Sequence, residues 1–186
     1  MCLLSGGQAR TNKWRAFCDN DVTGRIANGL STLLENQMTI ESKILVIGIA
    51  LEAAGFWLLH EKDGLSPGTA DHMALKDKIA RVLKEVDEIF TDQSNELFGT
   101  WAHDTAECYN HLKHPKNPIP DSVRIGNCIY LAILVLRVLI AKELGADSQK
   151  LTERASRDRC HPNNFQMVRV PDPGELGLSP NPVNEA

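Results

Sequence analysis

Two long apolar runs constrain the fold of this chain more than any other feature of its sequence. Ile44–Leu59 spans 16 residues with one charge, Glu52, and Cys128–Ala141 spans 14 residues with one charge, Arg137. A membrane span needs about 20 apolar residues, and a charge near its centre is costly. Both runs are therefore predicted to be buried core helices.

Three further segments have the period of amphipathic helices, and no stretch alternates apolar and polar residues as a strand would. We expect helices over 21–36, from Thr39 to about Lys62, over 69–90, from Asp92 or Ser94 to about Lys113, and from Asp121 or Ser122 to Gly145. The sequence thus predicts an all-α fold, a bundle of four to five helices over residues 20–145. Residues 1–19 are expected to be a loose lead-in, and residues 146–186 a polar, proline-rich and largely disordered tail.

The overall charge and the cysteines narrow the class of protein. A formal net charge of −4 argues against a protein that coats DNA through bulk positive charge, but it allows a local basic patch. The five cysteines are odd in number and form no CxxC pair, so neither a disulfide framework nor a zinc knuckle is predicted. The first residues lack the pattern of a signal peptide, and we expect a cytoplasmic protein that does not enter a membrane.

The fourth predicted helix carries the groups best suited to chemistry. At about 100° per residue, the side opposite its apolar stripe carries His103, Glu107, Asn110 and His114. His111 and Lys113 flank that polar side. Imidazoles titrate near neutral pH, so this face has the groups for acid–base chemistry. A polar stripe is also what any solvated surface helix shows, and that simpler interpretation stays open.

A metal site is a second hypothesis for the same helix. His103, Glu107 and His111 lie at i, i+4 and i+8, and together with Glu52 they offer ligands of the kind that helical bundles use. Bundles that bind metals usually draw ligands from several helices, and here the other helices contribute only isolated candidates. We therefore favour chemistry without a metal or other cofactor.

Three segments of the chain resemble a known family. They are KILVIGIALEAAGFWLL (43–59), ECYNHLKHP (107–115) and RVLIAKELG (137–145). Over residues 38–145 they resemble the Apea-like branch of the HEPN superfamily, in which an early core helix carries an ALEA-like string. A later helix of that family ends in arginine, a polar residue, three variable residues and histidine. The resemblance implies a metal-independent endoribonuclease in bacterial defence or a toxin–antitoxin pair, working as a homodimer with two motifs across a cleft.

The family motif carries over to the end of the fourth helix with one departure. His114 matches the histidine and Asn110 the polar residue, whereas Tyr109 stands where the family usually has arginine. Attack of a ribose 2′-OH on the adjacent phosphate needs proton transfer and stabilisation of negative charge. We therefore expect His114, Asn110 and Lys113 to be the catalytic residues, although lysine replaces a bidentate arginine only in part.

The remaining site residues follow from the same resemblance. Tyr109 and Lys116 are predicted to bind substrate, the tyrosine by stacking on a base or by hydrogen bonding to a phosphate. Glu52 and Glu107 are expected to support the site, and a buried Glu52 needs a cationic partner from another helix. Simpler structural roles stay open, because His114 suits a helix C-terminus and Tyr109 borders the apolar stripe. The missing arginine also supports a degenerate module that binds RNA or a protein partner such as an antitoxin.

Overall fold

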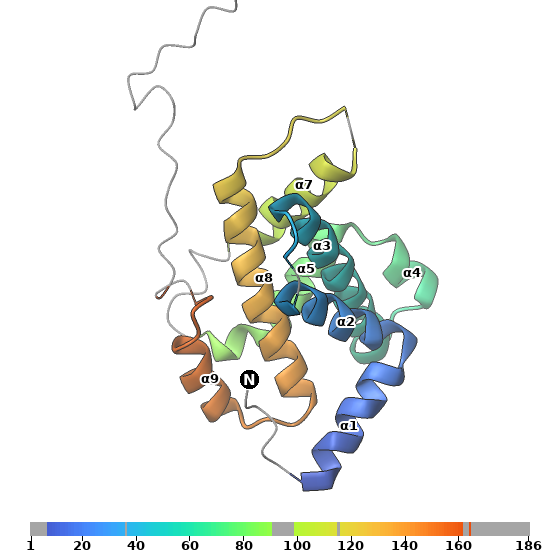
Figure 1. Cartoon of the computed structure of the whole chain (residues 1–186). Coiled ribbons are helices and arrows are strands. Elements are labelled where there is room, and N and C mark those ends of the chain that lie inside the picture. The colour runs from blue at the N-terminus through green and yellow to red at the C-terminus, as the bar shows by residue number, and fades with distance from the viewer. Residues whose placement is uncertain (1–6, 36, 91–98, 115, 162–163, 165–186) are drawn as a thin grey trace, which may run out of the picture.

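The computed structural model describes residues 7–35, 37–90, 99–114, 116–161 and 164, and these residues form helices and connections without a strand. The helices are α1 (Gly7–Asp19), α2 (Asp21–Glu35), α3 (Ile40–Trp57), η1 (Leu58–Lys62), α4 (Pro67–His72), α5 (Leu75–Val86), η2 (Asp87–Ile89), α7 (Trp101–Lys113), α8 (Ser122–Glu143) and α9 (Ser148–Ser156). Figure 1 shows α3 and α8 at the centre, with α2, α5 and α7 packed around them. The predicted all-α fold is confirmed.

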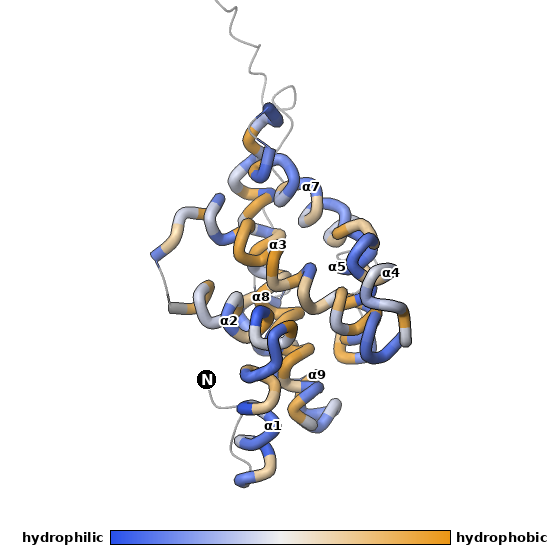
Figure 2. Tube along the Cα trace, turned by 90° about the vertical axis from the view of Figure 1, so that its right-hand side faces the viewer, coloured by the Kyte–Doolittle hydropathy of each residue, from blue (hydrophilic) through white to orange (hydrophobic). Residues whose placement is uncertain are grey.

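The two apolar runs of the sequence form α3 and α8, the central helices. Figure 2 shows them as strongly hydrophobic parts of the trace, with more polar helices around them. The continuous helix of α3 and η1 (Ile40–Lys62) and α8 are each long and apolar enough to cross a membrane, and 56% and 67% of their most hydrophobic windows are buried inside the bundle. Arg137, the one charge in the second run, reaches the edge of the core and pairs with Asp158 at 2.7 Å. This burial agrees with the prediction of two core helices.

Local signals set the ends of these two helices. Thr39 accepts a hydrogen bond from the N–H of Ser42 at 3.3 Å where α3 begins, and Asp121 accepts one from the N–H of Arg124 at 3.1 Å where α8 begins. Gly145 follows α8 with φ of 78°, a left-handed conformation that glycine adopts without strain and that ends helices. These ends agree with those predicted from the sequence.

The N-terminal segment differs from the prediction. Residues 1–19 are expected to be a loose lead-in, whereas the structure has a helix, α1, over Gly7–Asp19. Trp14 and Phe17 lie three positions apart on one face of it and stack with ring centroids 6.2 Å apart. Phe17 also meets Trp57 at the end of α3, edge to face at 6.3 Å. These aromatic contacts, rather than a continuous apolar period, fasten α1 to the bundle.

The helix expected over 69–90 is also divided in the structure. Ser66 caps α4 by accepting a hydrogen bond from the N–H of Thr69 at 3.1 Å, and Pro67 occupies the first turn. Met73 and Ala74 then have extended backbones, which separates α4 from α5. The apolar period of the sequence continues across this break, so periodicity alone predicts one helix where there are shorter ones.

The predicted disordered tail begins with ordered structure. Asp147 caps α9 by accepting a hydrogen bond from the N–H of Lys150 at 2.9 Å, and Leu151 and Ala155 are buried where α9 packs on α8. The prediction for residues 146–186 is therefore wrong over α9. The rest of that tail from residue 165, and the predicted start of the fourth helix at Asp92 or Ser94, lie outside the described residues.

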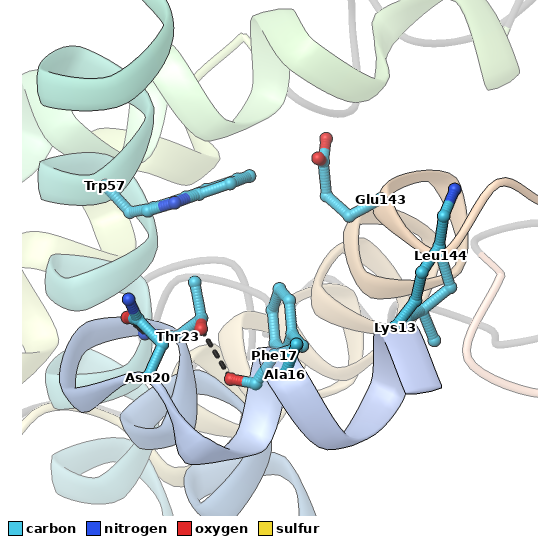
Figure 3. A pocket seen from close by; sticks show the side chains of 8 residues that line it. All are labelled: Lys13, Ala16, Phe17, Asn20, Thr23, Trp57, Glu143 and Leu144. Atoms are coloured by element: carbon cyan, nitrogen blue, oxygen red, sulfur yellow. Dashed lines mark hydrogen bonds between the residues drawn. The ribbon is translucent and has the colours of Figure 1, made fainter. Parts of the chain in front are cut away.

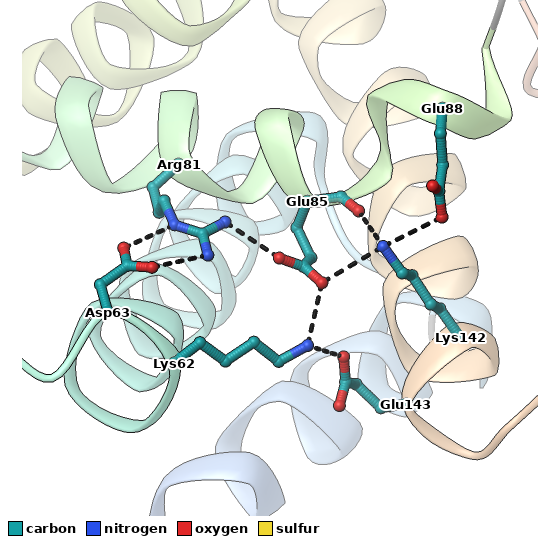
Figure 4. Close-up of polar contacts among 7 residues, drawn as sticks. All are labelled: Lys62, Asp63, Arg81, Glu85, Glu88, Lys142 and Glu143. Carbon is teal, nitrogen blue, oxygen red and sulfur yellow. Dashed lines mark hydrogen bonds and ion pairs between the residues drawn. The ribbon is translucent and has the colours of Figure 1, made fainter.

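Charged side chains join η1, α5 and α8 where these helices meet (Figure 4). This basal network consists of Lys62, Asp63, Arg81, Glu85, Glu88, Lys142 and Glu143. Glu85 lies at its centre, 2.9 Å from Lys62, 3.1 Å from Arg81 and 3.2 Å from Lys142. Partial burial raises the pKa of Glu85, but hydrogen bonds from these cations outweigh it and lower the pKa to about 2.

Candidate functional site

The helix α7, which carries the predicted motif, is fastened to the bundle along one side. The indole N–H of Trp101 donates to the carbonyl of Cys128 on α8 at 3.2 Å, and Thr105 and Cys108 are buried on the same side. This leaves the opposite side, including His103, Asn110 and Lys113, exposed to solvent. The two stripes predicted from the sequence thus match the orientation of α7, with the apolar stripe against the bundle and the polar stripe toward solvent.

The last turn of α7 and the connector after it present four polar side chains to solvent: Asn110, Lys113, His114 and Lys116, which we call the α7 end. The backbone N–H of His114 donates to the carbonyl of Asn110 at 3.2 Å, and the N–H of Asn117 donates to the carbonyl of His114 at 2.9 Å. These bonds fix the backbone there. Within the described part of the chain, no hydrogen bond or ion pair holds the side chain of Asn110 or His114, so both are available to a ligand.

Tyr109, which stands in place of the family arginine, points into the bundle. Its side chain is only 8% exposed and packs against Gly48 of α3, where a Cβ would lie 2.1 Å from Cδ2 of the ring. The ammonium of Lys113 lies over the same ring, 5.4 Å from its centroid. In this arrangement the tyrosine anchors α7, and a cation–π contact orients the lysine.

Arg124 is a residue of this region that the sequence analysis did not single out. Its guanidinium, in the first turn of α8, donates hydrogen bonds to both Asp104 and Glu107 on α7. The hydrogen bond from Arg124 holds the pKa of Glu107 below its usual range. His111 lies 3.6 Å from Glu107 on the same face. A signal for this pairing exists: a short connector makes α7 and α8 antiparallel, which places the first turn of α8 beside α7.

The structure brings only some of the predicted metal ligands close to one another. One ligand atom from each of His103, Asp104 and Glu107 lies within 4.8 Å of the others, and His111 is adjacent to Glu107. A positive group already occupies this place, because Arg124 binds both carboxylates. A metal ion would have to displace it, and the arrangement fits an arginine-bridged carboxylate pair better than a metal centre.

Glu52 has the cationic partner that its position in α3 calls for. The ammonium of Lys78, whose residue is fully buried, donates to Glu52 at 3.2 Å and to the carbonyl of Asp71 at 2.8 Å. Gly55 makes room for this lysine, since a Cβ there would lie 2.5 Å from Cβ of Lys78. The side chain of Glu52 is itself 46% exposed. The pair connects α3, α4 and α5, which is a structural role.

Comparison with known families assigns the chain to one of them. The sequence model of Apea-like HEPN matches residues 49–150, more than half of the chain. The chain is therefore a helical bundle of the HEPN class, and within that class it belongs to the Apea-like HEPN family. The matched range runs from within α3 to the start of α9, so α1 and α2 precede it. No curated protein and no solved structure matches the chain.

Proposed function

We propose that this HEPN domain binds single-stranded RNA at the α7 end and cleaves it weakly or not at all. The supporting observation is the α7 end itself, where exposed Lys113 and Lys116 offer positive charge beside the free amide of Asn110 and imidazole of His114. Phosphates of RNA bind such cations with an affinity that falls as salt rises. The carboxylates nearest along α7, Asp104 and Glu107, repel phosphate less because Arg124 binds them.

Loss of catalysis follows from Tyr109. Cleavage through the ribose 2′-OH requires a proton acceptor and a donor that stabilises the phosphate as its charge grows. His114 supplies the first, but the buried ring of Tyr109 supplies no guanidinium, and that of Arg124 is held by two carboxylates. Lysine contributes a point charge without bidentate geometry.

Metal-independent endoribonuclease activity is the second candidate. It is favoured by the pairing of an exposed amide and an exposed imidazole, Asn110 and His114, at the motif spacing of the family. Two copies of the α7 end facing each other would double the cations available to one phosphate. A role in defence, with an antitoxin or another protein as partner, belongs to the same proposal and is carried by family membership.

We also propose that the domain works as a homodimer. Along α3, Leu45, Ile49 and Phe56 follow one another at i, i+4 and i+11 on the side away from the core, and Ile49 is 52% exposed. This apolar stripe is next to Gly48, on which Tyr109 of α7 packs. Sedimentation of the Ile49→Lys variant tests the dimer, with Leu34→Lys on α2 as a matched control. A monomeric wild type would refute the dimer, and dimers in both variants would refute the α3 stripe as its interface.

The main test measures binding and cleavage together. Fluorescence anisotropy of a labelled single-stranded RNA in EDTA should show binding that is weakened about tenfold or more by Lys113→Ala with Lys116→Ala. The control replaces Lys76 and Lys150, exposed lysines elsewhere, and should bind as the wild type does. Equal loss in both double variants, or no binding at low salt, would overturn the proposal. Cleavage in EDTA that His114→Ala abolishes would select the ribonuclease instead.

A further inference from the structure

Two regions of α8 lie against other helices in different ways. At its C-terminal end a cavity of about 340 Å³ opens toward α1 and α3 (Figure 3), lined by Lys13, Ala16, Phe17, Asn20, Thr23, Trp57, Glu143 and Leu144. Phe17 stacks on Trp14 and meets Trp57 edge to face. The ammonium of Lys62 lies over the Trp57 ring, 5.4 Å from its centroid. These side chains contact one another, so this opening is where α1 is fastened to the bundle.

Nearer its N-terminal end, α8 faces α7 with a pair of thiols. Cys108 on α7 is 0% exposed and Cys128 on α8 is 2% exposed, and a hydrogen bond joins their side chains. The indole N–H of Trp101 donates to the carbonyl of Cys128 at 3.2 Å. One turn before that cysteine, Arg124 donates to Glu107, which directly precedes Cys108. These contacts hold the two sulfur atoms in one buried contact between the helices.

A hydroxyl adds a third polar group to this contact. Thr105 lies one turn before Cys108 on the buried side of α7 and is itself fully buried. Its Oγ1 has no hydrogen-bond partner of ordinary geometry among the described residues, and it lies beside the thiol of Cys128. Burying a hydroxyl without a good partner is costly. Cysteines often pack as small apolar groups, but that role does not account for the hydroxyl beside them.

The two thiols differ in acidity, and this assigns them different roles. The hydrogen bond from Cys128 lowers the pKa of Cys108, and the positive charge of Arg124 adds to this against the opposing effect of burial. The same hydrogen bond, together with burial, raises the pKa of Cys128. The thiolate is the form that attacks an oxidant, so Cys108 is the attacking sulfur and Cys128 the resolving one. Cys160 is as deeply buried, at 3% exposed, and burial raises its pKa to about 11.

We propose that Cys108 and Cys128 form a thiol-oxidation site that closes to a disulfide when the chain meets hydrogen peroxide. The thiolate of Cys108 attacks one peroxide oxygen and the O–O bond breaks. Cys108 becomes a sulfenic acid, and the released hydroxide takes up a proton and leaves as water. The sulfur of Cys128 then displaces the hydroxyl group from Cys108, so an S–S bond forms and a second water leaves. Hydrogen peroxide is little larger than water, and it reaches the buried pair when α7 opens locally.

The disulfide acts on the part of the chain that carries the α7 end. It closes the segment from Cys108 to Cys128 into a ring, which contains the α7 end, the connector after it and Arg124. A cross-link of this kind restricts the unfolded and locally opened states of the segment that it encloses. Oxidation thus fixes α7 to α8. The change is reversible, because thiol–disulfide exchange in a reducing compartment restores both thiols.

Peptide mapping of the full chain tests the pair directly. Trypsin cuts after Lys113 and Arg124, so Cys108 and Cys128 fall in different peptides, which stay joined only through a disulfide. After reduction and then exposure to millimolar hydrogen peroxide, the folded wild type should yield this linked pair while Cys160 stays a thiol. The midpoint of thermal unfolding should rise by about 5 °C or more, and dithiothreitol should reverse both changes.

Two variants assign the roles of the sulfur atoms. Cys128→Ala removes the resolving thiol, so dimedone should trap Cys108 as a sulfenic acid and no linked pair should form. Cys160→Ala removes a thiol of similar burial and should give the linked pair as the wild type does.

The wild type decides the proposal even if Cys128→Ala fails to fold. No linked pair from the folded chain, or oxidation of Cys160 as fast as that of Cys108, would overturn the oxidation site. An unchanged or lower midpoint of the bridged chain would overturn the fixing of α7 to α8. None of these measurements uses RNA, so their outcome is separate from that of the function proposed for the α7 end.

Discussion

At the C-terminal end of α8, Lys142 and Glu143 belong to the basal network, in which cations and carboxylates from η1, α5 and α8 are paired with one another. At its N-terminal end, about 30 Å away along the helix, Arg124 pairs with the carboxylates of α7, and beyond it Asn110, His114 and Lys116 stay exposed. The basal network uses its charges to join helices. The α7 end keeps polar groups that the fold does not use, which makes them available to a ligand.

The largest effect should come from the contact that orients the α7 end. Gly48→Ala places a Cβ against the ring of Tyr109, and we expect the free energy of unfolding to fall by about 3 kcal/mol because the packed ring must move. Urea unfolding measures it. Gly126→Ala is the matched control, since its Cβ would meet only Cδ1 of Ile40, at 3.8 Å, and alanine should stabilise α8 by about 0.5–1 kcal/mol. Equal stability of the two variants would contradict the close contact.

The basal network should give the next largest effect, and one that depends on pH. The folded-state pKa of Glu85 is about 2, below the ordinary 4.5, so its stabilisation is present above pH 4.5 and is lost as the pH falls toward 2. We expect Glu85→Gln to cost about 2 kcal/mol at pH 7 and progressively less below pH 4.5. Urea unfolding of both proteins between pH 7 and pH 3 measures the difference. Glu88→Gln, at an exposed carboxylate of the network, should change stability by less than about 0.5 kcal/mol.

A smaller effect is expected at the other end of α8. Arg124→Ala unpairs Asp104 and Glu107, but all three side chains are about one-third exposed, so the loss should be about 1 kcal/mol or less. Affinity for single-stranded RNA should fall several-fold, because two uncompensated carboxylates then lie beside the α7 end. Anisotropy titration measures this, with Arg25→Ala, an exposed arginine of α2, as control. Unchanged affinity would show that these carboxylates do not influence the binding surface.

The smallest effect on stability should come from His114. Its ring is exposed and no described residue binds it, so His114→Ala should change the free energy of unfolding by less than about 0.5 kcal/mol. Thermal and urea unfolding check this. A clear destabilisation would mean that the imidazole serves the fold, and the α7 end would then resemble the basal network instead of differing from it.

Much of the fold was predictable because its signals are local. The apolar runs of α3 and α8, the caps Thr39 and Asp121, and the glycine after α8 each act within a few residues of where they stand. The helix α1 was not predictable in this way, since Trp14 and Phe17 anchor it by contact with each other and with Trp57. Helix propensity alone, in a segment without a periodic apolar face, does not reveal that two aromatic side chains will hold the helix against the bundle.

In the candidate site, too, some features follow from local sequence and others depend on contacts between helices. The spacing of Asn110 and His114 placed both on the exposed side of α7, because helical geometry fixes that relation. The direction of Tyr109 could not be derived from α7 alone, since it depends on the missing side chain of Gly48 on another helix. The pairing of Arg124 with Asp104 and Glu107 likewise joins residues 20 and 17 positions apart.

The sequence by itself determined that this protein is a helical bundle, where most of its core helices begin and end, and which residues of the motif share a helix face. These properties depend on backbone geometry and on neighbours within a few positions. Only the tertiary structure decided which polar groups are paired and which stay free, and that α1 closes a cavity against Trp57 and Glu143. Those outcomes depend on distances between helices, which no local pattern encodes.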